Sequence, residues 1–106
     1  MELNTYHDTA SDTAVYPHKG ECGIDSLSYT VLGLVGEAGE LANKFKKHIR
    51  NNTPVDREVL ADELGDVLWY VAAVATELDI NLEDVARGNL LKLKSRAEKN
   101  QLTNHS

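Results

Sequence analysis

Residues 25–50 read DSLSYTVLGLVGEAGELANKFKKHIR, and residues 56–78 read DREVLADELGDVLWYVAAVATEL. In each stretch apolar residues recur every three or four positions, which is the period of an amphipathic helix. The short link between them contains Pro54 and two asparagines, so it predicts a turn. Two long helices joined by a short turn pack antiparallel along their apolar sides. Together these stretches predict a helical hairpin.

The apolar positions define one core stripe on each helix of the hairpin. The stripe of the first helix consists of Leu27, Val31, Leu34, Ala38, Leu41, Ala42, Phe45 and Ile49. The stripe of the second helix consists of Leu60, Leu64, Val67, Val71, Val74, Ala75 and Leu78. We expect the two stripes to face each other and to form the core of the protein.

Shorter elements flank the hairpin on both sides. Residues 2–13 predict a short first helix, and residues 14–24 predict a loop because they contain a proline and two glycines. Residues 82 to about 100 predict a last helix, and the polar tail 101–106 is expected to be frayed. No segment alternates between polar and apolar residues as a strand does. The predicted fold is therefore a single all-α domain of the four-helix-bundle type, spanning residues 1–106.

Small polar residues mark the expected helix starts. Asp25 or Ser26 is expected to cap the first hairpin helix, which then runs to about Arg50. Asp56 is the expected cap of the second hairpin helix, and Asn81 that of the last helix.

Composition narrows the class of protein. The 106 residues are 42% hydrophobic, which fits one globular domain, and the net charge of −6 argues against a general nucleic-acid binder. A single cysteine, Cys22, rules out an intrachain disulfide. The first residues show no signal-peptide pattern, and no apolar stretch approaches the ~20 residues that cross a membrane. We therefore expect a cytoplasmic protein without a membrane or nucleic-acid partner.

Two acidic pairs stand at matching places in the hairpin. Glu37 and Glu40 are three positions apart on the first helix, as Glu63 and Asp66 are on the second, so each pair projects from one side of its helix. Closing the hairpin brings four mutually repelling carboxylates into one patch beside the core, which favours a bound Mg²⁺ or Mn²⁺. The alternative is a solvated acidic face, or pairing with the nearby Lys44, Lys46 or Lys47.

Three glycines lie beside the first acidic pair, at positions 33, 36 and 39. Each costs a helix about 1 kcal/mol relative to alanine. Such a surface allows another backbone or a ligand to approach closely. For Gly36 and Gly39, close packing at a subunit interface and access for a ligand both remain open.

The last helix carries the opposite charge. Asn89, Lys92 and Arg96 share one face because they are three and four positions apart. Such a face beside a carboxylate–metal cluster can hold phosphate oxygens, with arginine making paired hydrogen bonds. The alternative is a solvated basic face near the end of a helix.

Three motifs together resemble the MazG-like branch of the all-α nucleotide pyrophosphohydrolases. They are GLVGEAGEL at 33–41, DELGDVL at 62–68 and NLLKLKSR at 89–96. The first two match the Glu-x-x-Glu and Glu-x-x-Asp signature of that family, with 22 residues between Glu40 and Glu63. The resemblance covers roughly residues 3–98.

The resemblance implies an Mg²⁺-dependent enzyme that cleaves a (deoxy)nucleoside triphosphate to the monophosphate and pyrophosphate, as in house-cleaning of the nucleotide pool. The implied metal ligands are Glu37, Glu40, Glu63 and Asp66. A carboxylate not fully engaged by the metal would serve as general base, and either Glu37 or Glu40 fits this role. Mn²⁺ is an expected substitute for Mg²⁺.

The resemblance also indicates substrate contacts. Implied phosphate contacts are Lys44, Asn89, Lys92 and Arg96. Tyr70 matches a position where relatives place a ring against the nucleotide, the alternative being a tyrosine at the core edge. His7 departs from the family pattern, since many relatives carry glutamine there in a Tyr-Gln pair. On the helical wheel Trp69 points away from the acidic side, so we expect it at the surface or at an interface.

Assembly is expected because a chain of this size has long helices and little core. Relatives commonly pair subunits about a twofold axis, often as a dimer of dimers, which implies a homotetramer with a homodimer as the alternative. Two rival functions remain: a non-catalytic nucleotide or metal sensor on the same bundle, and a purely structural helical module.

Overall fold

Residues 1–99 are described by a computed structural model, in which all regular secondary structure is helical. The helices are α1 (Leu3–Asp12), α2 (Ile24–Asn51), α3 (Arg57–Glu77) and α4 (Leu82–Lys99). The all-α prediction is confirmed, and these boundaries lie within one or two residues of those expected. The predicted end of the last helix and the frayed tail fall in 100–106, outside the described residues. None of these helices has the length and apolar content that a membrane crossing requires.

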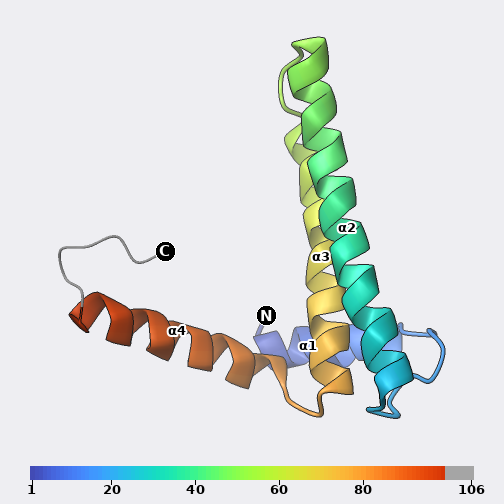
Figure 1. Ribbon diagram of the computed structural model, residues 1–106, viewed down its shortest axis with the longest axis vertical. Coiled ribbons are helices and arrows are strands. Elements are labelled where there is room, and N and C mark those ends of the chain that lie inside the picture. Colours follow the sequence, from blue (N-terminus) through green and yellow to red (C-terminus); the bar gives the residue numbers. More distant parts are fainter. Residues whose placement is uncertain (100–106) are drawn as a thin grey trace.

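The long arm of the molecule is the hairpin of α2 and α3, which lie side by side (Figure 1). Asn52 ends α2 in the left-handed conformation, with φ at 53°, which asparagine tolerates better than most residues. α1 crosses the open end of the hairpin, and α4 leaves from the same end and points away from it (Figure 1). α4 contacts α1 and α3, and it makes no contact with α2 in the described chain.

Two of the predicted caps are confirmed. Asp56 Oδ1 accepts hydrogen bonds from the N–H groups of Glu58 and Val59, at 3.1 and 3.2 Å. Asn81 Oδ1 accepts one from the N–H of Asp84 at 2.9 Å. Each side chain thereby satisfies donors that have no partner within their own helix.

The predicted cap of α2 is wrong. The helix begins at Ile24 with Gly23 in the capping position and no side-chain cap. Ser26 is instead buried inside the first turn, where its hydroxyl donates to Glu77 Oε1 at 2.6 Å. A tertiary partner has therefore taken the hydroxyl that the local pattern assigned to capping.

The core lies only in part where the apolar stripes placed it, because Ala75 is the one stripe residue that is buried. The buried apolar residues gather at the open end of the hairpin, around the crossing of α1. They are Ala10, Ala14, Tyr16, Ala72, Ala73, Ala75 and Leu82. Further along the arm, Ile49 is 69% exposed and Leu64 is 57% exposed. Two packed helices bury only the residues along their line of contact. The rest of a wider apolar stripe stays exposed to solvent unless a third element covers it.

Trp69, which we expect at the surface or at an interface, is half-buried in the single chain. Its indole N–H donates to Thr13 Oγ1 at 2.9 Å. Its ring packs edge-on against Tyr16 and Tyr70, with centroid distances of 6.4 and 5.0 Å. The crossing of α1 and the following loop cover this side of α3, which the wheel of one helix does not reveal.

His7 joins α1 to the start of α4. Its Nδ1 accepts a hydrogen bond from the backbone N–H of Leu82 at 3.1 Å, so the ring proton is on Nε2, which donates to Thr76 Oγ1 at 2.8 Å. Both ring nitrogens are thus used in packing. The residue that departs from the family pattern has a structural role here and is not free to reach a nucleotide.

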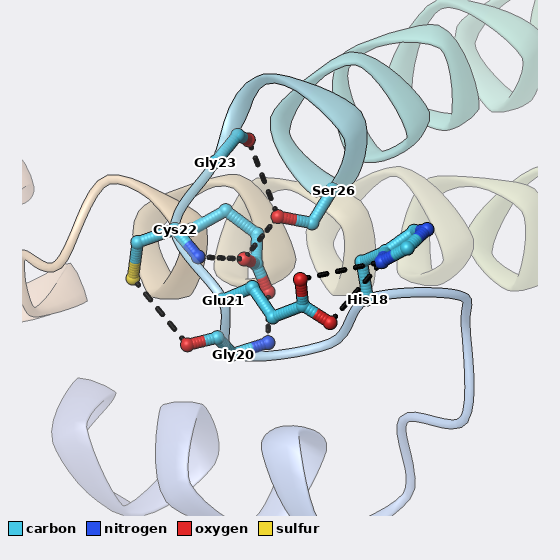
Figure 2. A network of polar contacts seen from close by, with 7 residues as sticks. His18, Gly20, Glu21, Cys22, Gly23 and Ser26 are labelled. Atoms are coloured by element: carbon cyan, nitrogen blue, oxygen red, sulfur yellow. Dashed lines mark hydrogen bonds and ion pairs between the residues drawn. The ribbon is translucent and has the colours of Figure 1, made fainter.

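A buried carboxylate organises the loop between α1 and α2. Glu77 is 2% exposed and accepts four hydrogen bonds of 2.5 to 3.0 Å, from the hydroxyls of Tyr16 and Ser26 and the backbone N–H groups of Gly20 and Cys22. Figure 2 shows Gly20, Cys22 and Ser26 turned toward this network where the loop enters α2. Burial raises the pKa of Glu77, but the four hydrogen bonds outweigh it and lower the pKa to about 2.

Candidate functional site

Three of the four predicted ligands meet halfway along the hairpin. Glu37 on α2 and Glu63 and Asp66 on α3 each offer a carboxylate oxygen, and these oxygens lie within 4.8 Å of one another. Glu40, one turn further along α2, is exposed and lies outside this group. The juxtaposition across the two helices is the one that the matched spacing predicted. We refer to the three residues as the carboxylate cluster.

The negative charges of the cluster have no cationic side chain paired with them in residues 1–99. The pKa of Glu37 is raised first by desolvation, and then by the negative charges of Asp66, Glu63 and Glu40. In the described part of the chain no lysine or arginine forms an ion pair with these carboxylates; the ion pairs found are His18–Glu21 and Glu83–Arg87. The alternative in which nearby lysines neutralise the acidic pairs is therefore not what the structure contains.

The donor set suits a hard divalent cation. Mg²⁺ binds oxygen at about 2.1 Å, so two of its ligands lie at most about 4.2 Å apart. Carboxylate oxygens within 4.8 Å of one another come close to this limit. A cation would also relieve the mutual repulsion that raises the pKa of Glu37. The residues present thus fit Mg²⁺ or Mn²⁺.

Tyr70 lies beside the cluster in a notch made by a glycine. A Cβ atom added to Gly33 would come within 2.1 to 2.6 Å of three atoms of the Tyr70 ring, so only glycine allows this contact. The pKa of Tyr70 is raised by burial first, then by Tyr29, Glu37 and Asp66. Gly33 is therefore needed for packing within the chain.

Gly36 and Gly39 differ from Gly33. A Cβ atom added at either position would meet nothing within 4 Å. In the single chain both glycines border open space. Ligand access and a subunit contact are therefore both compatible with the structure.

The sequence did not single out Tyr16 and Tyr29, two aromatic residues that continue the site. Tyr16 and Tyr29 stack with centroids 5.8 Å apart and an interplanar angle of 15°, and Trp69 and Tyr70 extend the group through edge contacts. One signal was present in the sequence: Tyr29, Gly33 and Glu37 are spaced by four and therefore share one side of α2. The position of Tyr16 depends on a loop and has no such signal.

The predicted phosphate contacts are divided between two regions. Lys44 is half-buried on α2, two turns beyond Glu37. Asn89, Lys92 and Arg96 are exposed on α4, which points away from the hairpin (Figure 1) and makes no contact with α2. Within one chain these three residues do not join the carboxylate cluster, so their role stays a prediction that requires a second subunit.

An all-helical hairpin with an acidic cluster between its long helices defines the class of this protein. The family described as MazG nucleotide pyrophosphohydrolase domain matches residues 26–100, and the chain belongs to that family. The chain is 50% identical to the Gene 37 protein of Mycobacterium phage L5, over 93% of this chain and 91% of that protein. That name states no activity. No solved structure matches the chain significantly.

Proposed function

We propose that this protein hydrolyses a (deoxy)nucleoside triphosphate to the monophosphate and pyrophosphate in an Mg²⁺-dependent reaction, and that it cleans the cytoplasmic nucleotide pool. The observation that carries the proposal is the carboxylate cluster, in which oxygens from both hairpin helices lie within 4.8 Å. Membership of a nucleotide pyrophosphohydrolase family supplies the class of reaction. A purely structural module would leave the convergence of the carboxylates without a use, whereas a sensor would use them to bind metal without hydrolysing the nucleotide.

The carboxylates divide in this proposal into metal ligands and a general base. Glu37, Glu63 and Asp66 would hold Mg²⁺, which supplies charge neutralisation of the phosphates and a polarised water. Glu40 lies outside the cluster, which leaves its carboxylate available as general base, with Glu37 as the alternative. The base takes a proton from water as the water oxygen bonds to phosphorus, and the bridging P–O bond breaks to release pyrophosphate. Lys44 and Tyr70 would contact the substrate from α2 and α3.

Pyrophosphate release from a panel of ribo- and deoxynucleoside triphosphates tests the proposal. We expect release with Mg²⁺ or Mn²⁺ and none with a chelator, because the carboxylates alone repel the substrate. Nucleotide binding without hydrolysis under all conditions would favour the sensor. Absence of both binding and hydrolysis would favour the structural module.

We further propose a homotetramer, with a homodimer as the alternative. In the single chain several large apolar residues are exposed, among them Leu32, Leu64, Leu68, Leu90 and Leu91. One face of α3, lined by Ala61, Leu64, Val67, Leu68 and Val71, forms a shallow apolar groove. Large exposed apolar areas are typical of protein interfaces. In such an assembly α4 of one subunit would bring Asn89, Lys92 and Arg96 to the cluster of another.

Light scattering and thermal unfolding, each with Mg²⁺ and with chelator, measure the assembly and its link to the metal. We expect an oligomer with a higher melting temperature in Mg²⁺, because an ion bound only by the folded state stabilises that state by mass action. A monomer under both conditions with an unchanged melting temperature would contradict the assembly and the metal site together.

A further inference from the structure

A line of residues on α2 leads from the carboxylate cluster to an aromatic group. Tyr29, Gly33 and Glu37 lie on one side of the helix at intervals of four. The eight residues from Tyr29 to Glu37 correspond to about 12 Å along the helix axis. Gly33, halfway along, is covered by the ring of Tyr70 from the neighbouring helix. In a nucleotide the sugar separates the base from the phosphates, so a residue that binds the base is expected at some distance from the cluster.

The Tyr29 ring is held in place but remains partly open. Tyr16 stacks on it with an interplanar angle of 15°, while 44% of Tyr29 is exposed to solvent. Tyr16 itself is buried, and its hydroxyl donates to the buried carboxylate of Glu77. An exposed ring supported from behind in this way needs little reordering before a second ring stacks on it.

Tyr70 connects the aromatic group to the cluster. The ring of Tyr70 lies against Gly33, midway between Tyr29 and Glu37 on α2, so Tyr70 lies between the two regions. Trp69 packs edge-on against both Tyr16 and Tyr70. Tyr29, Gly33 and Glu37 on α2, with the Tyr70 ring against Gly33, therefore lead from the aromatic group to the carboxylate cluster.

We propose that Tyr29 is the residue on which the nucleobase stacks, with Tyr16 as its support. This inference rests on the proposed function and adds the place where the base binds. Stacking on an aromatic ring tolerates any base because every base has a π-face. Tyr29 would therefore contribute affinity for purine and pyrimidine nucleotides alike, without selecting one base.

Calorimetric titration with α,β-imido analogues of dATP and dCTP in Mg²⁺ tests the inference, because these analogues resist cleavage between the first two phosphates. Inorganic tripolyphosphate serves as the ligand without a base. Tyr29→Leu keeps an apolar side chain but removes the ring, and Tyr29→Phe keeps the ring. We expect Tyr29→Leu to raise the Kd of both analogues about tenfold, the size expected for one stacked base. Tyr29→Phe should stay near wild type, and tripolyphosphate should bind all three proteins equally.

The outcomes separate this inference from the function on which it rests. Unchanged analogue affinity in Tyr29→Leu, or an equal loss for tripolyphosphate, would overturn the role of Tyr29 while leaving hydrolysis by the wild type intact. If neither analogue bound the wild type and no nucleotide were hydrolysed, the proposed function and this inference would fall together. Thermal unfolding of both variants shows whether they are folded. Should Tyr29→Leu fail to fold, Tyr29→Met, which also removes the ring, is titrated with the same three ligands and gives the same decision.

Discussion

Replacing Asp66 with asparagine is expected to lower Mg²⁺-dependent pyrophosphate release about a hundredfold or more, the size seen when one preorganised electrostatic contact to a transition state is removed. Asparagine keeps the shape of the side chain and one oxygen but removes the charge from a group whose oxygens lie within 4.8 Å. The fold should persist, because Asp66 is exposed and its negative charge repels that of Glu37. Glu40→Gln is expected to abolish turnover in the same way, through loss of the proton acceptor.

The two readouts, activity and stability, should move in different directions. Without metal, Asp66→Asn should melt at the same temperature as wild type or higher, because one repelling charge is gone. In Mg²⁺ the increase in melting temperature should be smaller than in wild type. Asp25→Asn, which neutralises an exposed carboxylate of α2 outside the cluster, is the control and should behave like wild type. Wild-type turnover in Asp66→Asn would remove Asp66 from the metal site.

The largest loss of stability is expected from Glu77→Gln, about 2–4 kcal/mol, since it disturbs a buried network of charge-assisted hydrogen bonds. Each carboxylate oxygen accepts one backbone N–H, that of Gly20 on Oε2 and that of Cys22 on Oε1. An amide has only one oxygen, so one of these N–H groups must face an NH₂ group instead. Chemical unfolding at neutral pH measures the loss. Glu21→Gln, an exposed carboxylate of the same loop, should change stability by no more than about 0.5 kcal/mol.

The contribution of Glu77 also depends on pH. Its pKa is about 2 in the folded protein against an ordinary value of 4.5, which corresponds to about 3 kcal/mol of stabilisation. Because the folded pKa is the lower one, this stabilisation is fully present above about pH 4.5 and is lost as the pH falls toward 2. Between neutral pH and pH 3 the wild type should lose about 2 kcal/mol more than Glu77→Gln. Equal losses in the two proteins would show that folding does not lower the pKa of Glu77.

Local patterns were reliable where the deciding interaction is local. The helical period located all the helices of residues 1–99, and Asp56 and Asn81 cap their helices because a cap bonds only to the next turn. Ser26 did not follow its local pattern because its hydroxyl bonds to Glu77, 51 residues further along the chain. The helical wheel of α3 likewise placed Trp69 outside, since it contains no information about where α1 crosses.

The sequence by itself determined the all-α class, the hairpin and the meeting of Glu37 with Glu63 and Asp66. Helical spacing fixes which side chains share a face, and a short turn fixes how two helices pair. Only the tertiary structure decided where the core lies, that Tyr16 supports Tyr29, and that α4, which carries Asn89, Lys92 and Arg96, points away from the hairpin. These features depend on the path of the loop between α1 and α2 and on the direction of α4. That direction is set by the bond of Leu82 to His7 and by the contacts of α4 with α3. Contacts between residues distant in the chain set both, and no periodicity within a single helix encodes them.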